Sequence, residues 1–255
     1  MIYIKIGGII DISTKDIPQK SSMVIFTVGC NFRCEFCHNK YLLYPNVGKD
    51  IGLQNIISKI TSNLLVGSVS ISGGEPTLQN DIIEVCKQIS ATNKYLSVDT
   101  NGSRPEIIMQ LLPYINRIAL DLKVSPLNEK RYDEITNSKS DPLKIIESFS
   151  ILNTKEGLDF EIRTTYVENL IEPEDIHEII SFLQENEFKG NFVLQQYQSS
   201  EGVEEKYRQK FEKPLHSTML NILKPYKDLI LPFDIYLRNE VVGYKKINEI
   251  FVNIK

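Results

Sequence analysis

Three of the four cysteines in the chain lie close together, in the segment GCNFRCEFCHN from Gly29 to Asn39. Cys30, Cys34 and Cys37 give the spacing C-x3-C-x2-C, which supplies three thiolates from one short loop. In a reducing compartment, clustered thiols are more often metal ligands or redox groups than disulfides. The segment therefore predicts a metal centre or a redox site.

The spacing alone leaves three kinds of site open. Structural zinc takes four ligands, normally from two separated segments, and His38 as the fourth ligand would be directly adjacent to Cys37. A thioredoxin-like pair would use Cys34 and Cys37 and leave Cys30 without a role. A [4Fe-4S] cluster held by three cysteines leaves one iron without a protein ligand, which is an open position for chemistry. The fourth cysteine, Cys86, lies in a helical pattern and is expected to be a small buried apolar residue.

The composition of the chain indicates one large globular domain. Its 255 residues are 42% apolar and 24% charged. The 29 basic and 33 acidic residues give a net charge of -4, without the basic excess that favours nucleic acid or an anionic membrane surface. Apolar runs such as MVIFTVG from Met23 are too short to cross a bilayer, and no signal-peptide pattern follows Met1. We therefore expect a cytoplasmic protein that has neither a membrane nor nucleic acid as a partner.

Short β-branched runs alternate with helical patterns along most of the chain, which predicts a parallel sheet. The expected strands span 23–28, 67–72, 95–100, 117–122, 159–166 and 191–197. The expected helices span 51–63, 78–90, 104–112, 142–153 and 173–186, where apolar residues recur at three- and four-residue spacing. Pro105 and Pro173 suit the first turns of two of these helices.

Four of the expected strands carry a small or polar face opposite an apolar one. The serines of GSVSISGG share one face of the second strand, and Asp99, Asp121 and Arg163 lie on the polar faces of the next three. A strand covered by helices on both sides should be apolar on both faces, whereas a barrel can turn a polar face into its lumen. The sequence therefore predicts an α/β fold with a wet, partly closed barrel.

Distinctive motifs follow the first four expected strands. The cysteine segment follows the first strand, and SGGEP, DTNG and DLK begin at Ser72, Asp99 and Asp121 at the ends of the next three. Arg163 and the LQQYQ segment of residues 194–198 lie toward the ends of the remaining two. Because the carboxyl ends of parallel strands meet at one edge, where ligands and catalytic groups gather, we expect a single site there.

Together these motifs resemble the radical S-adenosylmethionine (SAM) superfamily. Cys30, Cys34 and Cys37, with Phe36 before the last cysteine, are similar to its cluster-binding signature, and SGGEP is similar to its glycine-rich element. The segments GGIIDIST, DTNG, LDLK and LQQY resemble the activating-enzyme branch, which installs glycyl radicals, and within it the activating proteins of anaerobic ribonucleotide reductase. The likeness covers roughly residues 7–198.

The resemblance implies a partial (β/α)6 barrel of the TIM type over residues 1–200, with residues 201–255 as a C-terminal extension packed on that core. It implies a [4Fe-4S] cluster on Cys30, Cys34 and Cys37, with the open iron chelated by the amino and carboxylate groups of SAM. An electron from a reduced flavodoxin or ferredoxin-type donor would cleave SAM to methionine and a 5'-deoxyadenosyl radical, which abstracts hydrogen from the substrate.

The partner implied by the resemblance is a glycyl-radical protein such as anaerobic ribonucleotide reductase. Two alternatives stay open. One is a radical SAM enzyme that acts on a small molecule, a nucleoside or a peptide side chain. The other is a non-catalytic iron-sulfur electron carrier, which would explain the thiolates but neither SGGEP nor the polar lumen.

Residues expected to contact SAM lie in the loop motifs and on the polar strand faces: Phe36, Gly73, Gly74, Glu75, Asp99, Lys123, Arg163 and Gln198. Lys123 is expected to neutralise the SAM carboxylate, and Arg163 either assists it or belongs to a lumen salt-bridge network. Gln198 stands where pyruvate formate-lyase activases have a histidine. Asp99, Thr100 and Asp121 form an oxygen-rich group that suits a monovalent cation beside SAM.

Overall fold

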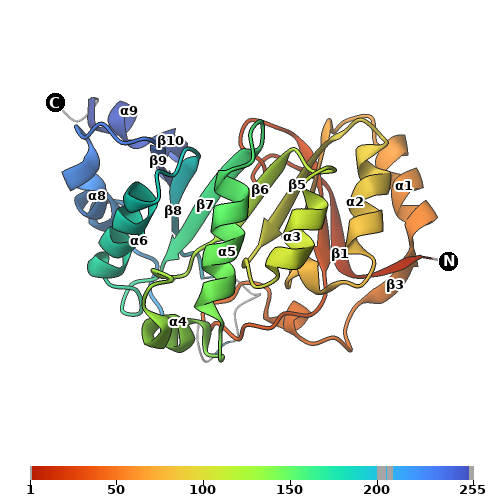
Figure 1. Cartoon of the computed structure of the whole chain (residues 1–255), viewed down its shortest axis with the longest axis horizontal. Helices are drawn as coiled ribbons and strands as arrows, with labels where there is room; N and C mark the ends of the chain where they lie inside the picture. Colours follow the sequence, from red (N-terminus) through yellow and green to blue (C-terminus); the bar gives the residue numbers. More distant parts are fainter. Residues whose placement is uncertain (1, 200–204, 206–208, 253–255) are drawn as a thin grey trace.

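The computed structural model describes residues 2–199, 205 and 209–252, and these fold around one ten-stranded sheet (Figure 1). The strand order is β10-β9-β8-β7-β6-β5-β4-β2-β1-β3. The strands are β1 Tyr3–Ser13, β2 Ser22–Thr27, β3 Lys49–Gly52, β4 Ser68–Gly73, β5 Tyr95–Thr100, β6 Arg117–Asp121, β7 Asp159–Tyr166, β8 Asn191–Gln196, β9 Asp234–Asn239 and β10 Gly243–Lys246.

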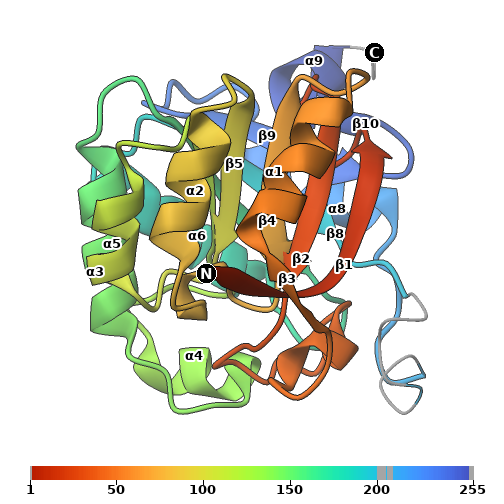
Figure 2. The same cartoon turned by 90° about the vertical axis from the view of Figure 1, so that its right-hand side faces the viewer.

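The central strands, from β2 through β4 to β9, are parallel, and antiparallel strands flank them at both ends. β1 lies beside β2 and carries β3 on its outer side, while β10 pairs with β9. Since β10 and β3 are the two ends of the strand order, the sheet stays open. Figure 2 shows the molecule from the side of the β1 and β3 end. The expected α/β fold with a partial barrel is confirmed.

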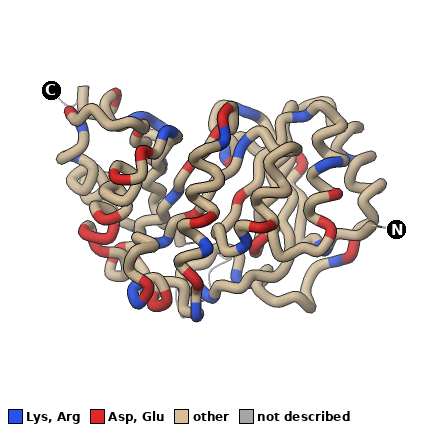
Figure 3. The backbone as a smooth tube through the Cα atoms, viewed as in Figure 1, with Lys and Arg blue, Asp and Glu red and all other residues tan. Residues whose placement is uncertain are grey.

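Helices cover the outer face of the sheet, and Figure 1 shows α2, α3, α5 and α6 over its near side. Val69, Ile71 and Val98 are fully buried, as expected for the apolar strand faces under the helices. The helices are α1 Leu53–Ser62, α2 Ile82–Ser90, α3 Pro105–Leu111, α4 Glu129–Thr136, α5 Pro142–Asn153, α6 Pro173–Glu185, α8 His216–Leu223 and α9 Ile247–Val252. Acidic and basic residues are interspersed along the backbone (Figure 3).

All six expected strands and all five expected helices are present. Two helices start at least two residues later than expected. α1 begins at Leu53, because residues 51 and 52 belong to β3. α2 begins only at Ile82, because Pro76–Leu78 forms a separate 3-10 turn. Pro105 and Pro173 stand in first turns, as predicted. At the start of α6 the side chain of Asp175 accepts a 2.9 Å hydrogen bond from the backbone N–H of Glu172, which forms a capping box.

The C-terminal residues contribute to the same sheet. β9 is parallel to β8 and adds one strand beyond the six that were expected, and β10 follows it as an antiparallel edge. A division at residue 200 falls among residues 200–204, outside the described part of the chain, so that boundary stays a prediction. Among the described helices, none has the length and apolar character needed to span a bilayer.

Candidate functional site

A polar cavity of about 340 Å³ lies at the carboxyl ends of the parallel strands. This volume falls within the range typical of small-molecule sites, about 300–1,000 Å³. Most of the residues that we expected in the site line this cavity, and they come from five consecutive βα units. They are Cys30, Cys34, Phe36, Cys37, Gly73, Gly74, Glu75, Asp99, Thr100, Asp121, Lys123 and Arg163. The topology thus brings together motifs that are spread over more than half of the chain.

The three cysteines of the loop are free thiols at one end of this cavity. Cys34 is buried, and Cys30 and Cys37 are partly exposed. Burial, together with the nearby Glu75 carboxylate, raises the pKa of Cys30 to about 12. Burial raises the pKa of Cys34 to about 11, although the positive charge of Lys123 opposes this rise. Without a bound metal the thiols therefore hold their protons at neutral pH, and binding a metal would release them.

Helix α4 supports the cysteine loop. The backbone N–H of Arg33 donates a 2.9 Å hydrogen bond to the carbonyl of Thr136, the last residue of α4. The ring of Phe32 meets the ring of Tyr132 edge to face at 6.2 Å, and both side chains are buried. The loop is therefore fixed by a helix that the sequence patterns did not predict.

The two glycines of SGGEP allow the first two loops to touch. A Cβ on Gly74 would lie 2.1 Å from the carbonyl oxygen of Gly29, and one on Gly73 would lie 2.3 Å from the carbonyl oxygen of Thr27. Gly73 also has a φ of +118°, a conformation that favours glycine. The N–H of Glu75 donates a 2.7 Å hydrogen bond to the Gly29 carbonyl. The glycines are thus needed for loop packing, and both still line the cavity.

Glu75 is fully buried and ties the second loop to the third. Its Oε2 accepts a 2.7 Å hydrogen bond from the N–H of Asn101, and its Oε1 accepts one of 2.7 Å from the Thr100 hydroxyl. Thr77 donates two further bonds to Oε1, from its hydroxyl and its backbone N–H. Burial raises the pKa of Glu75, and these four donors oppose the rise. Because its oxygens are occupied, Glu75 orients the loops.

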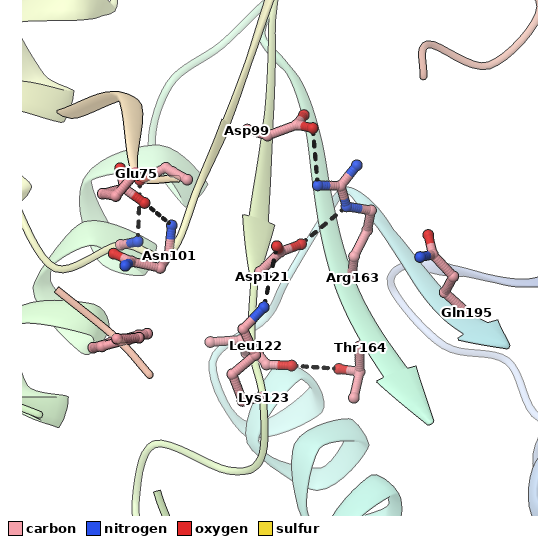
Figure 4. Close-up of polar contacts among 12 residues, drawn as sticks. Glu75, Asp99, Asn101, Asp121, Leu122, Lys123, Arg163, Thr164 and Gln195 are labelled. Atoms are coloured by element: carbon pink, nitrogen blue, oxygen red, sulfur yellow. Dashed lines mark hydrogen bonds and ion pairs between the residues drawn. The ribbon is translucent and has the colours of Figure 1, made fainter. Parts of the chain in front are cut away.

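Arg163 is the centre of an ion network in the lumen (Figure 4). Its Nη2 lies 3.2 Å from Asp99 Oδ2, and its Nε donates a 3.0 Å hydrogen bond to Asp121 Oδ1. Lys123 donates a 3.2 Å bond to the other oxygen of Asp121. Burial opposes ionisation of Asp121, but the two cations outweigh it, and its pKa lies below the usual value. Of the two roles expected for Arg163, this geometry supports the salt-bridge network.

The oxygens expected to bind a monovalent cation already have partners in the protein. The Thr100 hydroxyl bonds to Glu75, whereas Asp99 and Asp121 face Arg163. The guanidinium therefore stands between the two carboxylates. A cation at this position stays a prediction.

Gln198 lies outside the cavity lining and donates a 2.7 Å hydrogen bond to Gln196. The lining instead includes Gln195 of β8 and Arg238 of β9. Gln195 shares its strand face with residue 193 and points away from the buried Leu194, so strict alternation along 191–196 could have identified it. Alternation in DIYLRN places Arg238 similarly, but β9 was not among the expected strands.

Two buried polar atoms of cavity residues lack a hydrogen bond among the described residues: Nε2 of His38, and Oδ1 of Asp99, which has only a 3.8 Å ion pair with Arg117. Buried polar atoms without partners are costly, so a cavity that contains them favours a polar ligand. No three His, Cys, Asp or Glu side chains of the described residues converge as on a single metal ion. Three thiols, a glycine loop and charged side chains that line one cavity nevertheless suit a larger metal cluster with a polar, zwitterionic ligand.

The fold and the site define the chain as an α/β enzyme whose cavity lies at the carboxyl ends of a partial barrel. The Radical SAM superfamily model matches residues 24–191, and the chain belongs to this superfamily. It is 33% identical over 214 residues to a Methanocaldococcus jannaschii protein named as a candidate glycyl-radical enzyme activating enzyme, which covers 80% of this chain and 84% of that protein.

Further comparisons agree with this placement. The pyruvate formate-lyase-activating enzyme of Listeria monocytogenes is 27% identical over 174 residues, which are 63% of this chain and 68% of that protein. The resemblance to the activating-enzyme branch is therefore confirmed. The solved structure of Streptococcus suis SuiB bound to S-adenosylmethionine shares the fold, with a TM-score of 0.67 at 21% identity over 85% of this chain and 50% of that one.

Proposed function

We propose that this chain is a glycyl-radical activating enzyme that binds a [4Fe-4S] cluster through Cys30, Cys34 and Cys37 and binds SAM in the adjoining cavity. Its substrate is a glycine residue of a partner protein such as anaerobic ribonucleotide reductase. The observation that carries this proposal is the meeting of three free thiols and a charged, partly unsatisfied lumen in one cavity. The activity named for two relatives supports the choice of substrate.

When bound, the reduced cluster supplies the electron that cleaves SAM to methionine and a 5'-deoxyadenosyl radical, which removes hydrogen from glycine. The protein's residues bind and orient the reactants. The charge of Lys123 opposes the burial-driven rise in the pKa of Cys34, so Lys123 lies near the cysteine loop, where it can pair with the SAM carboxylate. Phe36, 4% exposed, gives this end an apolar wall for adenine.

The amino group of SAM needs acceptors near the same end. One is the carbonyl of Gly73, a cavity residue, which accepts a 3.5 Å hydrogen bond from the Asn39 amide and has a second lone pair. The second is the carboxylate of Asp99, which lines the cavity between the guanidinium groups of Arg163 and Arg117. A carbonyl and a carboxylate together suit an ammonium group. A reduced flavodoxin or ferredoxin-type protein is proposed as the electron donor.

The test is anoxic reconstitution with iron, sulfide, SAM and reductant, followed by addition of purified anaerobic ribonucleotide reductase. The proposal expects an electron paramagnetic resonance doublet of a glycyl radical on the reductase. Conversion of SAM to 5'-deoxyadenosine with no radical on this or any other glycyl-radical protein would instead support a small-molecule, nucleoside or peptide side-chain substrate. No conversion of SAM would support the electron carrier.

A further inference from the structure

Arg238 lies in the wall of the same cavity as the cysteines, on strand β9. In the sheet register it is paired with Gln195 of β8, and Gln195 is paired with Thr165 of β7. All three residues line the cavity. We call this row of Thr165, Gln195 and Arg238 the β7–β9 wall.

The β7–β9 wall belongs to a different part of the sheet from the cysteine loop. The loop follows β2, and six strand spacings separate β2 from β9 in the strand order. At about 4.8 Å per spacing this is roughly 29 Å along the curved sheet. The β7–β9 wall and the cysteine loop thus lie on different strands of the partial barrel, and Asp99 and Asp121 lie on strands between them.

The guanidinium of Arg238 is held by two neutral groups. Its Nη1 donates a 3.2 Å hydrogen bond to Gln195 Oε1, and its Nη2 donates one to the backbone carbonyl of Lys15, in the connection from β1 to β2. Within the described ranges no carboxylate lies within ion-pair distance of Arg238, whereas Arg163 has two such partners. Arg238 is thus fixed in position without a paired negative charge from the described part of the chain.

Arg238 and Gln195 each have side-chain N–H groups that make no hydrogen bond within the described part of the chain. A guanidinium has five N–H groups, more than its two bonds require. The oxygen of Gln195 is taken by Arg238, so its amide nitrogen is the part available to a ligand (Figure 4 shows the Gln195 side chain). Burial and the nearby charge of Arg163 lower the pKa of Arg238, and the carboxylates of Glu161, Asp16 and Asp99 oppose this without reaching ion-pair distance.

We propose that Arg238 and Gln195 form a substrate subsite that binds acceptor oxygens of the partner's glycine-bearing segment, namely its peptide carbonyls. This inference rests on the proposed function and names residues that determine its substrate. The other source of acceptor oxygens is the SAM carboxylate. We assign that group to Lys123, a cavity residue whose ammonium group has three donors and gives one hydrogen bond, to Asp121 Oδ2, among the described residues.

The test uses anoxically reconstituted, full-length wild type, Arg238→Gln and Gln195→Leu, with Arg104→Gln as control. Arg104 is a partly exposed arginine paired with Glu106, outside the cavity lining. For each variant three quantities are measured: the Kd for SAM by equilibrium dialysis, the KM for purified anaerobic ribonucleotide reductase in radical formation, and the calorimetric affinity of the SAM-loaded enzyme for the capped peptide acetyl-Gly-Gly-Gly-amide.

The subsite predicts that Arg238→Gln raises the KM for the reductase about 10- to 100-fold, as expected for a lost hydrogen bond to a charged group, and that Gln195→Leu raises it about 2- to 10-fold, as expected for a neutral one. Both should weaken peptide binding, while the Kd for SAM changes less than about twofold. Arg104→Gln should match wild type. An SAM Kd weakened tenfold in Arg238→Gln would overturn the assignment in favour of the SAM carboxylate. Equal peptide affinity in wild type and Arg238→Gln, including no binding to either, would also overturn it.

The proposed partner and the proposed subsite can be disproved separately. If wild type forms no radical on the reductase, the proposed partner is wrong, and the peptide measurement still decides the subsite. If wild type forms the radical and Arg238→Gln does so with unchanged KM, the partner stands and the subsite is wrong.

Discussion

The carboxylate of Glu75 accepts a 2.7 Å hydrogen bond from the backbone N–H of Asn101. This single contact joins the loop after β4 to the loop after β5, and the amide of Asn101 continues the connection to Asn31 in the cysteine loop at 2.9 Å. Three loops that are distant in sequence thus form one connected rim around the cysteine end of the cavity.

Glu75→Gln replaces one acceptor oxygen with an N–H₂ group that faces donors. Hydrogen bonds to a charged group contribute about 1.5–3 kcal/mol each, so we expect the free energy of unfolding to fall by at least about 2 kcal/mol. Urea denaturation measures this change. Glu84→Gln at a partly exposed position of α2 is the matched control, and a loss no larger than that of the control would contradict the orienting role of Glu75.

Gly74→Ala introduces a Cβ that would lie 2.1 Å from the Gly29 carbonyl oxygen, so the two loops must move apart. We expect weaker SAM binding, by about tenfold, and a destabilisation of about 1–3 kcal/mol typical of overpacking. The control is Gly67→Ala, where a Cβ would meet no atom within 4 Å. Equilibrium binding of SAM to both reconstituted variants tests the prediction, and equal affinities would argue against it.

Arg131→Gln should loosen the cysteine loop through α4. Arg131 holds Asp175 of α6 with two hydrogen bonds, of 3.1 and 2.7 Å, and bonds to the Leu170 carbonyl at 2.7 Å. Its loss is expected to cost about 1.5–3 kcal/mol of stability. Hydrogen exchange should become faster in α4 and at the backbone N–H of Arg33, which bonds to Thr136. Unchanged exchange at Arg33 would mean that α4 does not support the loop.

The stability contributed by Asp121 should depend on pH in the acid range. Its folded-state pKa lies below its usual value of about 3.8 because of Arg163 and Lys123. The contribution is therefore complete above the unfolded-state pKa and is lost as the pH falls through the folded-state pKa. We expect Asp121→Asn to be less stable than wild type at pH 7, with the difference shrinking below about pH 4. Urea denaturation at several pH values measures this, and a constant difference would contradict the ion network.

Much of the fold follows from local pattern. The strands β2 and β4 to β8 were recognisable as apolar runs or alternating segments, and helices such as α5 by three- and four-residue periodicity, because burial in the sheet and under the helices imposes these patterns. β1 contains two adjacent glycines, and α4 is rich in charged residues, with too few apolar residues to form a clear apolar stripe. Their places are set by pairing with β2 and by packing on the cysteine loop, which are long-range contacts.

In the candidate site, too, some residues were identifiable from local sequence and others only from long-range contacts. The cysteines and SGGEP were identifiable because residue type and spacing carry the chemistry. Arg163 was identifiable as a lumen residue, but the choice between ligand contact and ion network needed the positions of Asp99 and Asp121. Gln198 was expected in the cavity instead of Gln195, because a motif gives the region while the strand register decides which side chain faces the lumen.

The central claim is that Cys30, Cys34 and Cys37 hold a [4Fe-4S] cluster that cleaves SAM. Its most direct test is iron and sulfide content, with 5'-deoxyadenosine formation, in anoxically reconstituted wild type, Cys34→Ala and Cys86→Ala. The account predicts one [4Fe-4S] cluster per chain in wild type and in Cys86→Ala, whose altered side chain is buried in α2. For Cys34→Ala it predicts loss of the cluster and a fall in SAM cleavage of more than about 100-fold. Loss of a residue that only supports a metal ligand typically lowers activity about 10- to 100-fold, and loss of the ligand itself should cost more. Zinc in wild type, or undiminished SAM cleavage by Cys34→Ala, would contradict it.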